Sequence, residues 1–267
     1  MNLSSGIVVG QYLPGHSLLH RMDPRAKLLF VFAYMITIFL ANNALTYLLF
    51  TVITLSGLFL SKVPVRMFFS GLKPVFFLIL LTIIFHLFVT KGGATLVQLG
   101  PVSIDEEGVY KAVFISLRIF LLLTTAFLLT LTTSPLDLTD GLEQLLSPLR
   151  FFRVPVYELA LMMSIALRFI PTLWEEALKI MKAQQARGAN FTQGSTLKLI
   201  RSFMPVLIPL IIASFRRAED LALAMEARCY RGGEGRTRLR ELKYTRIDFG
   251  LLVLFILLMS SLFWLRT

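Results

Sequence analysis

The chain has little of what most soluble enzymes use for chemistry or for covalent stability. Among its 267 residues there is one cysteine, Cys229, and there are three histidines, at positions 16, 20 and 86. A single cysteine excludes a disulfide within the chain and points away from an oxidising compartment. The three scattered histidines do not indicate a metal site. Charged residues make up 16% of the chain, against about 25% in soluble domains.

Motifs of several functional classes are also missing from the sequence. There is no Gly-x-x-x-x-Gly-Lys-Ser/Thr loop, so ATP hydrolysis would have to come from a partner protein. No nucleic-acid-binding motif is visible, and the basic residues are mixed with carboxylates, which argues against nucleic acid as a partner. Residues 1–6 lack the basic and apolar regions of a signal peptide. Membrane insertion would therefore depend on later apolar runs.

Apolar residues are what the chain has in excess. They form 56% of the sequence, and the mean hydropathy is +0.73, whereas soluble domains are about 45–50% apolar. The sequence therefore predicts an all-α, polytopic membrane protein with about five transmembrane helices. The first two predicted spans are near the lower length limit for crossing and are expected to extend by a turn into the interface. The expected spans are residues 26–41, 44–61, 74–89, 112–133 and 249–265.

The net charge of +11 is unevenly distributed, and its distribution predicts the orientation. Of the 27 lysines and arginines, 17 lie between Ser134 and Arg246. With the N-terminus inside, 23 basic residues fall on the inner side and three on the outer side, as the positive-inside rule requires. Topology and contact with anionic lipid explain most of this charge. Arg118 lies within the fourth span, where it could be functional or could extend to the interface.

Residues 134–247 form a separate segment, which we expect to be a cytoplasmic or interfacial domain of long amphipathic helices. It divides the chain into residues 1–133, 134–247 and 248–267. The apolar run 157–170 is short, contains charge and is followed by Pro171, so a helix lying along or dipping into the membrane is expected. An amphipathic pattern follows up to Gly188. A second one, after a kink or break expected at Pro205 and Pro209, runs to Gly232.

Both amphipathic segments end in a short tripeptide with a central arginine. The arginines are 41 residues apart, in a weak internal repeat. Each guanidinium offers five donors in a rigid fork, which could bind a partner's carboxylates or carbonyls while small neighbours allow close approach. Alternatively, each arginine could cap its own helix. The candidate site residues are Ala186, Arg187, Gly188, Ala227, Arg228 and Cys229.

Several motifs together resemble the transmembrane component of energy-coupling factor (ECF) transporters over nearly the full length. The stretch 14–27, with Asp23-Pro24-Arg25, resembles the family's N-terminal motif, although Asp-Pro is also an ordinary helix N-cap arrangement. Residues 166–171 with 183–188 resemble its first coupling element. Residues 217–221 with 224–228 resemble the second, except that Cys229 stands where the family has glycine. Without glycine, a left-handed backbone conformation at position 229 is not expected from the sequence. The expected role of Arg228 is unaffected.

The resemblance implies a non-catalytic subunit of an ATP-driven importer in a prokaryotic cell membrane. Two crossing cytoplasmic coupling helices would insert Arg187 and Arg228 into grooves of two ABC-type ATPase subunits. Ala186, Gly188 and Ala227 would be the small neighbours of these arginines. An interchangeable S component would bind the vitamin, and ATP-driven closure would tip it within the membrane. The chain itself would bind no cofactor, and ATP would be used by the partners. Specificity for the vitamin would belong to the S component.

Two other classes of protein stay open at this point. A secondary transporter or channel would need broken helices or several midplane charges, and Arg118 alone qualifies. An intramembrane enzyme would need a convergent catalytic set, which His86 and isolated hydroxyls do not supply. Within the family, a dedicated cobalt or nickel system is the alternative to a shared vitamin module.

Overall fold

A computed structural model describes residues 12–99, 102–189, 191, 196–232 and 242–265. Nearly all of its regular structure is helical, which confirms the expected all-α class. The chain divides into two compact units. We call Gly10–Leu145 together with Glu241–Thr267 the membrane unit, and Leu146–Arg240 the hairpin unit.

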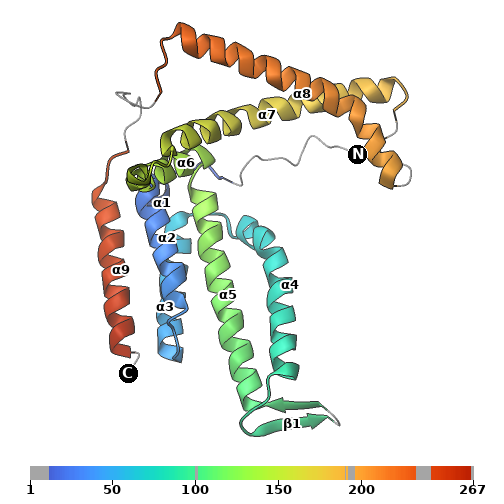
Figure 1. Ribbon diagram of the computed structural model, residues 1–267. Coiled ribbons are helices and arrows are strands. Elements are labelled where there is room, and N and C mark those ends of the chain that lie inside the picture. The colour runs from blue at the N-terminus through green and yellow to red at the C-terminus, as the bar shows by residue number, and fades with distance from the viewer. Residues whose placement is uncertain (1–11, 100–101, 190, 192–195, 233–241, 266–267) are drawn as a thin grey trace. The chain divides into compact units, whose positions relative to one another are not determined.

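The membrane unit consists of helices and one small antiparallel sheet (Figure 1). In the sheet, Leu99 pairs with Val102 and Val97 with Ile104. The two strands connect the ends of α4 and α5, which pack against each other. In chain order the elements are α1 (Leu18–Arg21), α2 (Pro24–Ile38), α3 (Ala44–Ser61), α4 (Val65–Val89), β1 (Thr95–Leu99), β2 (Val102–Asp105), α5 (Glu106–Thr132), α6 (Pro135–Leu145) and α9 (Arg246–Leu265).

Within the described residues, five helices are long and apolar enough to span a membrane. They are α3, α4, α5 and α9 of the membrane unit and α7 of the hairpin unit. Large apolar side chains cover their outer surfaces, including Phe59, which is 81% exposed, and Phe263, which is 85% exposed. Water-soluble proteins rarely expose apolar surface of this extent. These side chains are therefore suited to contact lipid.

The first expected span is wrong in its extent. Helix α2 has 15 residues and ends at Ile38, which gives a length of about 22 Å, short of the ~30 Å hydrocarbon core. The chain turns back before α3 begins at Ala44. Arg118 of α5 donates a hydrogen bond to the Ala41 carbonyl at 3.1 Å, and its guanidinium lies 5.4 Å from the Phe39 ring centre. The arginine thus satisfies a backbone acceptor in the turn.

Helices α4 and α5 extend further than the apolar runs indicated. Helix α4 begins at Val65 and continues through Pro74, and α5 begins directly at Glu106. Glycines allow the two helices to approach closely: a Cβ on Gly71 would lie 2.1 Å from Phe127, and one on Gly108 would lie 2.9 Å from the Thr90 carbonyl. The two helices are packed at distances that a larger residue at either position would disturb.

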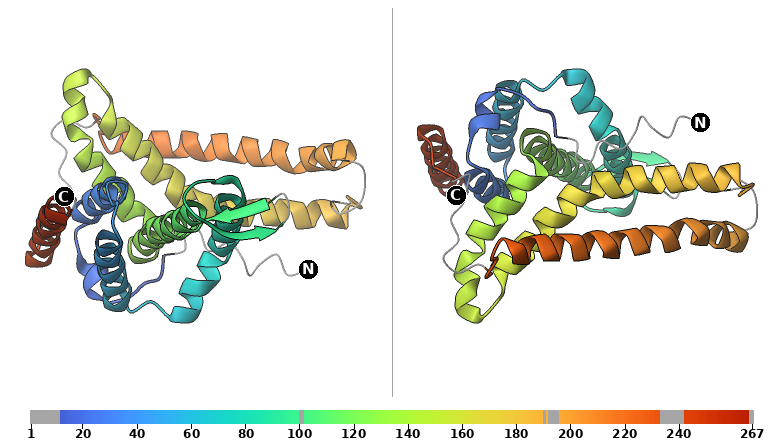
Figure 2. Two further views of the ribbon diagram at one scale, coloured as in Figure 1. Left: turned by 90° about the horizontal axis from the view of Figure 1, so that it is seen from below. Right: turned by 90° about the horizontal axis from the view of Figure 1, so that it is seen from above.

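The hairpin unit contains the 3₁₀ helix η1 (Ser147–Phe152) and two long helices, α7 (Val156–Ala186) and α8 (Thr196–Ala227). The expectation that Pro171 ends the first apolar segment is wrong, because α7 continues through it for 31 residues. Helix α8 likewise continues across Pro205 and Pro209. A proline removes one backbone hydrogen bond of the helix. The other backbone hydrogen bonds remain, because helix extends on both sides of each proline. Figure 2 shows α7 and α8 side by side.

Candidate functional site

The first candidate tip is the end of α7, where the chain forms a complete backbone C-cap. Arg187 is the C-cap residue. The Gly188 amide donates to the Gln185 carbonyl at 3.0 Å, and the Ala189 amide donates to the Gln184 carbonyl at 3.0 Å. This pair of hydrogen bonds defines a Schellman motif. Gly188 has a φ of +89°, which glycine adopts without a steric penalty.

The second tip, at the end of α8, has the same construction. The Cys229 amide donates to the Glu226 carbonyl at 2.8 Å, and the Tyr230 amide donates to the Met225 carbonyl at 3.0 Å. Cys229 therefore takes the position of Gly188, and its φ is +56°. The missing glycine does not change the backbone conformation, although a side chain in this region is unfavourable. Arg228 occupies the position of Arg187 in the first tip.

Both arginine side chains extend from caps that the backbone has already completed. In the described part of the chain, neither guanidinium has a hydrogen bond or an ion pair to another residue. The orphan carbonyls of each helix end accept bonds from backbone amides instead. All six candidate residues are exposed: Ala186, Arg187, Gly188, Ala227, Arg228 and Cys229.

The hairpin places the two tips at opposite ends. Helices α7 and α8 are antiparallel, since Arg217 forms an ion pair with Glu176 and the Gln184 side-chain amide donates to the Pro205 carbonyl at 3.4 Å. Pro205 therefore marks the level on α8 that adjoins the first tip. From there to Arg228, α8 rises by about 35 Å at 1.5 Å per residue. Two separate binding sites on a partner, or two partners, would match this separation.

A groove between the same helices has a largely apolar lining and a volume of about 320 Å³. Phe169 and Leu173 of α7 line it together with Leu221 and Met225 of α8. Arg217 lies at this groove and is held by Glu176. The coupling-element residue Arg217 therefore has a partner within the hairpin, which distinguishes it from the two tip arginines.

A second polar cluster, in the membrane unit, surrounds the Asp23-Pro24-Arg25 motif. Asp23 caps α2, as the N-cap interpretation predicted: its carboxylate accepts a hydrogen bond from the Arg25 amide at 2.9 Å. The Asp23 amide in turn donates to Asp248 at 2.9 Å. Burial alone would raise the pKa of Asp23, but hydrogen bonds from Arg25 and the charges of Arg25 and Lys27 outweigh it, so the pKa lies below 3.8.

Sequence analysis did not identify the other members of this cluster. Asp248 is separated from Asp23 by 225 residues, and no local pattern relates them. Lys27 lies at the start of the first expected span, and its side chain is buried. Its ammonium donates to the Thr132 carbonyl and the Thr133 hydroxyl, both at 3.1 Å. A lysine before an apolar run gives no signal that it is buried.

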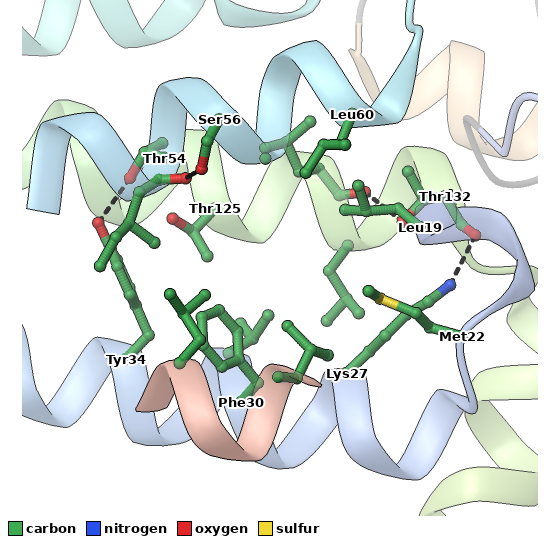
Figure 3. A pocket seen from close by; sticks show the side chains of 17 residues that line it. Leu19, Met22, Lys27, Phe30, Tyr34, Thr54, Ser56, Leu60, Thr125 and Thr132 are labelled. Atoms are coloured by element: carbon green, nitrogen blue, oxygen red, sulfur yellow. Dashed lines mark hydrogen bonds between the residues drawn. The ribbon is translucent and has the colours of Figure 1, made fainter. Parts of the chain in front are cut away.

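Lys27 also lies at one end of a cavity of about 120 Å³ inside the membrane unit. Figure 3 shows Lys27 and Thr132 at one end and Tyr34 with Thr54 at the other. The Tyr34 hydroxyl is 2.6 Å from the Thr54 hydroxyl, and most of the lining is apolar. In the described residues, no three His, Cys, Asp or Glu side chains lie close enough together to hold a metal ion. The cavity lacks a convergent set of polar groups with which to orient a polar substrate.

Comparison with known proteins gives a consistent family. The profile of the Cobalt transport protein family (CbiQ) matches residues 15–239. The chain is 54% identical to the energy-coupling factor transporter transmembrane protein EcfT of Brevibacillus brevis, over 98% of each chain. It is 47% identical to EcfT of Bacillus subtilis, over 99% of this chain and 100% of the relative. It is 51% identical to EcfT of Listeria innocua, over 98% of each chain.

The chain belongs to the EcfT family of energy-coupling factor transporter transmembrane proteins. Family membership confirms the resemblance drawn from the sequence motifs and assigns the chain a role in transport. EcfT family proteins are transmembrane components of their transporters, so this chain is a membrane subunit that acts in a complex with other subunits. The apolar helices α3, α4, α5 and α9 agree with a multi-pass membrane protein.

Proposed function

We propose that the chain is the energy-coupling subunit of an ECF-type importer for vitamins in a prokaryotic cell membrane. Two ABC-type ATPase subunits, which would form a heterodimer, bind the tips of α7 and α8. ATP-driven closure of that pair moves the hairpin unit, and the movement tips an interchangeable S component that releases its vitamin inside. The chain binds no cofactor and hydrolyses no ATP itself.

The observation that carries this proposal is the pair of equivalent arginine tips. Arg187 and Arg228 follow the same backbone cap, are exposed, and have no side-chain partner in the described residues. A guanidinium presented in this way is suited to bidentate binding of a carboxylate or of carbonyl groups. Two equivalent tips at opposite ends of a hairpin suit two homologous ATPase subunits. The concentration of basic residues between Ser134 and Arg246 supports a cytoplasmic position for the hairpin.

The test is the double substitution R187E/R228E, made in the full-length protein that is co-expressed with the ATPase pair and an S component. We expect the ATPases to be lost from the purified complex and vitamin uptake to fall to background. A matched control is K182E/R216E, because both residues are exposed on the same two helices and the change in net charge is equal. Normal assembly and uptake of R187E/R228E would refute the assignment.

A cobalt or nickel importer is the second candidate, because the matching family profile is described as a cobalt transport protein. The tips would have the same role, but the substrate-binding partner would be dedicated to a metal ion. The proteins that co-purify in mild detergent distinguish the two. Several vitamin-binding S components would support the shared module, whereas a single metal-transport partner with Co²⁺ or Ni²⁺ uptake would support the alternative.

A further inference from the structure

Arg25 has the most extensively bonded side chain of the described polar cluster in the membrane unit. Its Nε donates to one Asp23 oxygen at 3.0 Å, and its Nη2 donates to the other at 2.7 Å. Its Nη1 donates to the Gln144 side-chain carbonyl at 2.7 Å, and its Nη2 also reaches the Leu242 backbone carbonyl at 3.1 Å. The guanidinium carbon lies 4.0 Å from the centre of the Tyr244 ring.

Two residues that Arg25 binds, Gln144 and Leu242, lie next to the two boundaries between the membrane unit and the hairpin unit. Gln144 is two residues before Leu146, where the chain passes from the membrane unit into the hairpin unit. Leu242 is two residues after Arg240, where the chain returns. Residues 146–240 are thus joined to the membrane unit by two covalent connections. One guanidinium binds the membrane-unit side of both.

The guanidinium is itself rigidly held. The Arg25 side chain is 13% exposed and the Asp23 side chain 1% exposed, and Asp23 uses both carboxylate oxygens on Arg25. A bidentate arginine–carboxylate pair fixes the plane of the guanidinium. The Asp23 backbone is in turn bonded to Asp248, which also accepts from the Thr245 amide and hydroxyl at the start of α9. The anchor therefore includes the first residues of both α2 and α9.

We propose that Arg25 is a positioning residue that clamps both connections of the hairpin unit, so that force applied to the hairpin reaches the membrane helices. This inference rests on the proposed function. Without the clamp, the two connections can move independently of α2 and α9. ATP-driven motion of the hairpin then displaces the connections and does not move the membrane helices. Arg25 then affects the coupling of ATP hydrolysis to transport, and not the binding of the ATPases.

The test measures ATP hydrolysis per substrate molecule transported, in proteoliposomes that contain the complete complex. The probe is tritiated riboflavin with a riboflavin-binding S component. The variant R25K keeps the charge but loses the fork, and cannot hold Asp23, Gln144 and Leu242 together. We expect the ATPases to co-purify with R25K, and the ATP consumed per riboflavin to rise about tenfold, as for the loss of a hydrogen bond to a charged group.

Variants of Gln144 separate the clamp from general stability. Q144L removes only the bond to the first connection, and its ratio of ATP to riboflavin should rise less than that of R25K. Q144E keeps an acceptor and makes it charged, so the ratio should stay near that of the wild type. G108A serves as the structural comparator: it disturbs the packing of α5 against the end of α4 and leaves every bond of Arg25 in place. It should lower the unfolding temperature without uncoupling.

The outcomes distinguish this inference from the proposed function. If R25K assembles and its ratio stays within about twofold of the wild type, far below the tenfold effect expected from the lost bonds, the clamp is refuted and the proposed function stands. If G108A uncouples as strongly as R25K, uncoupling follows from lost stability alone and the inference is again refuted. If the wild-type chain retains no ATPase at all, the proposed function itself fails.

Discussion

Gly188 and Cys229 occupy the same position in two helix terminations with the same hydrogen bonds, at φ values of +89° and +56°. The conformation favours glycine, because a Cβ in the left-handed region costs about 1–2 kcal/mol. The second tip is thus built with a residue that its backbone disfavours.

Replacing Cys229 by glycine should therefore stabilise the end of α8. We expect C229G to strengthen the cap by about 1 kcal/mol and to leave uptake unchanged, since the arginine and the backbone hydrogen bonds remain. Amide hydrogen exchange at Tyr230, whose amide bonds to Met225, measures the local effect. A loss of uptake would show that the cysteine side chain itself contacts a partner. G188A, by contrast, should weaken the first cap by a similar amount.

The comparison of the two tips shows what could be predicted from the sequence. Each helix end is marked by local features: an amphipathic stripe, then the arginine, then a helix-terminating residue. The sites of helix termination could therefore be located from the sequence pattern. The left-handed geometry of Cys229 could not, because the preference of the residue opposes it and backbone bonds across the helix end override that preference. Proline was misleading in the same way at Pro171, where the chain remains helical on both sides.

The membrane unit was less predictable because its polar contacts join distant segments. The start of α2 could be placed by its Asp-Pro sequence, but the bond between the Asp23 amide and Asp248 spans 225 residues. The turn after α2 likewise includes a long-range contact, because Arg118 binds the Ala41 carbonyl from another helix. Hydropathy alone located the apolar runs and could not show that one of them turns back early.

The ion pair between Glu176 and Arg217 should contribute modestly to the stability of the hairpin. Their side chains are 27% and 33% exposed, and ion pairs at such positions contribute about 0–1 kcal/mol. A double-mutant cycle with E176Q and R217M, followed by thermal unfolding in detergent, should give a coupling energy in that range. The charge-reversed pair E176R/R217E should recover most of the loss. A recovery no better than either single variant would contradict the pairing.

Two glycines in membrane helices should respond oppositely to alanine. In α5, a Cβ on Gly108 would lie 2.9 Å from the Thr90 carbonyl and 3.0 Å from the His86 carbonyl, and backbone cannot easily move away. G108A should destabilise the protein by about 1–3 kcal/mol. In α3, a Cβ on Gly57 would meet only Leu128, at 3.9 Å. G57A is therefore the matched control, and it should be neutral or gain up to about 1 kcal/mol. Equal effects would refute the close contact.

The charge of Asp23 should make the stability of the membrane unit depend on pH in the acid range. Its pKa in the folded protein lies below 3.8, because hydrogen bonds from Arg25 and the nearby positive charges favour the carboxylate. A lowered pKa contributes stability that is fully present above the unfolded pKa and is lost as the pH falls through the folded pKa.

The variant D23N isolates this charge, because asparagine is as good an N-cap as aspartate. At pH 6 we expect D23N to be less stable than the wild type by about 1–2 kcal/mol. The difference should shrink as the pH falls through the lowered pKa of Asp23, where the folded wild-type carboxylate becomes protonated. Unfolding temperatures of both proteins in the same detergent, between pH 6 and the lowest pH at which they remain folded, would measure it. A difference that does not change with pH would show that Asp23 acts through its cap geometry and not through its charge.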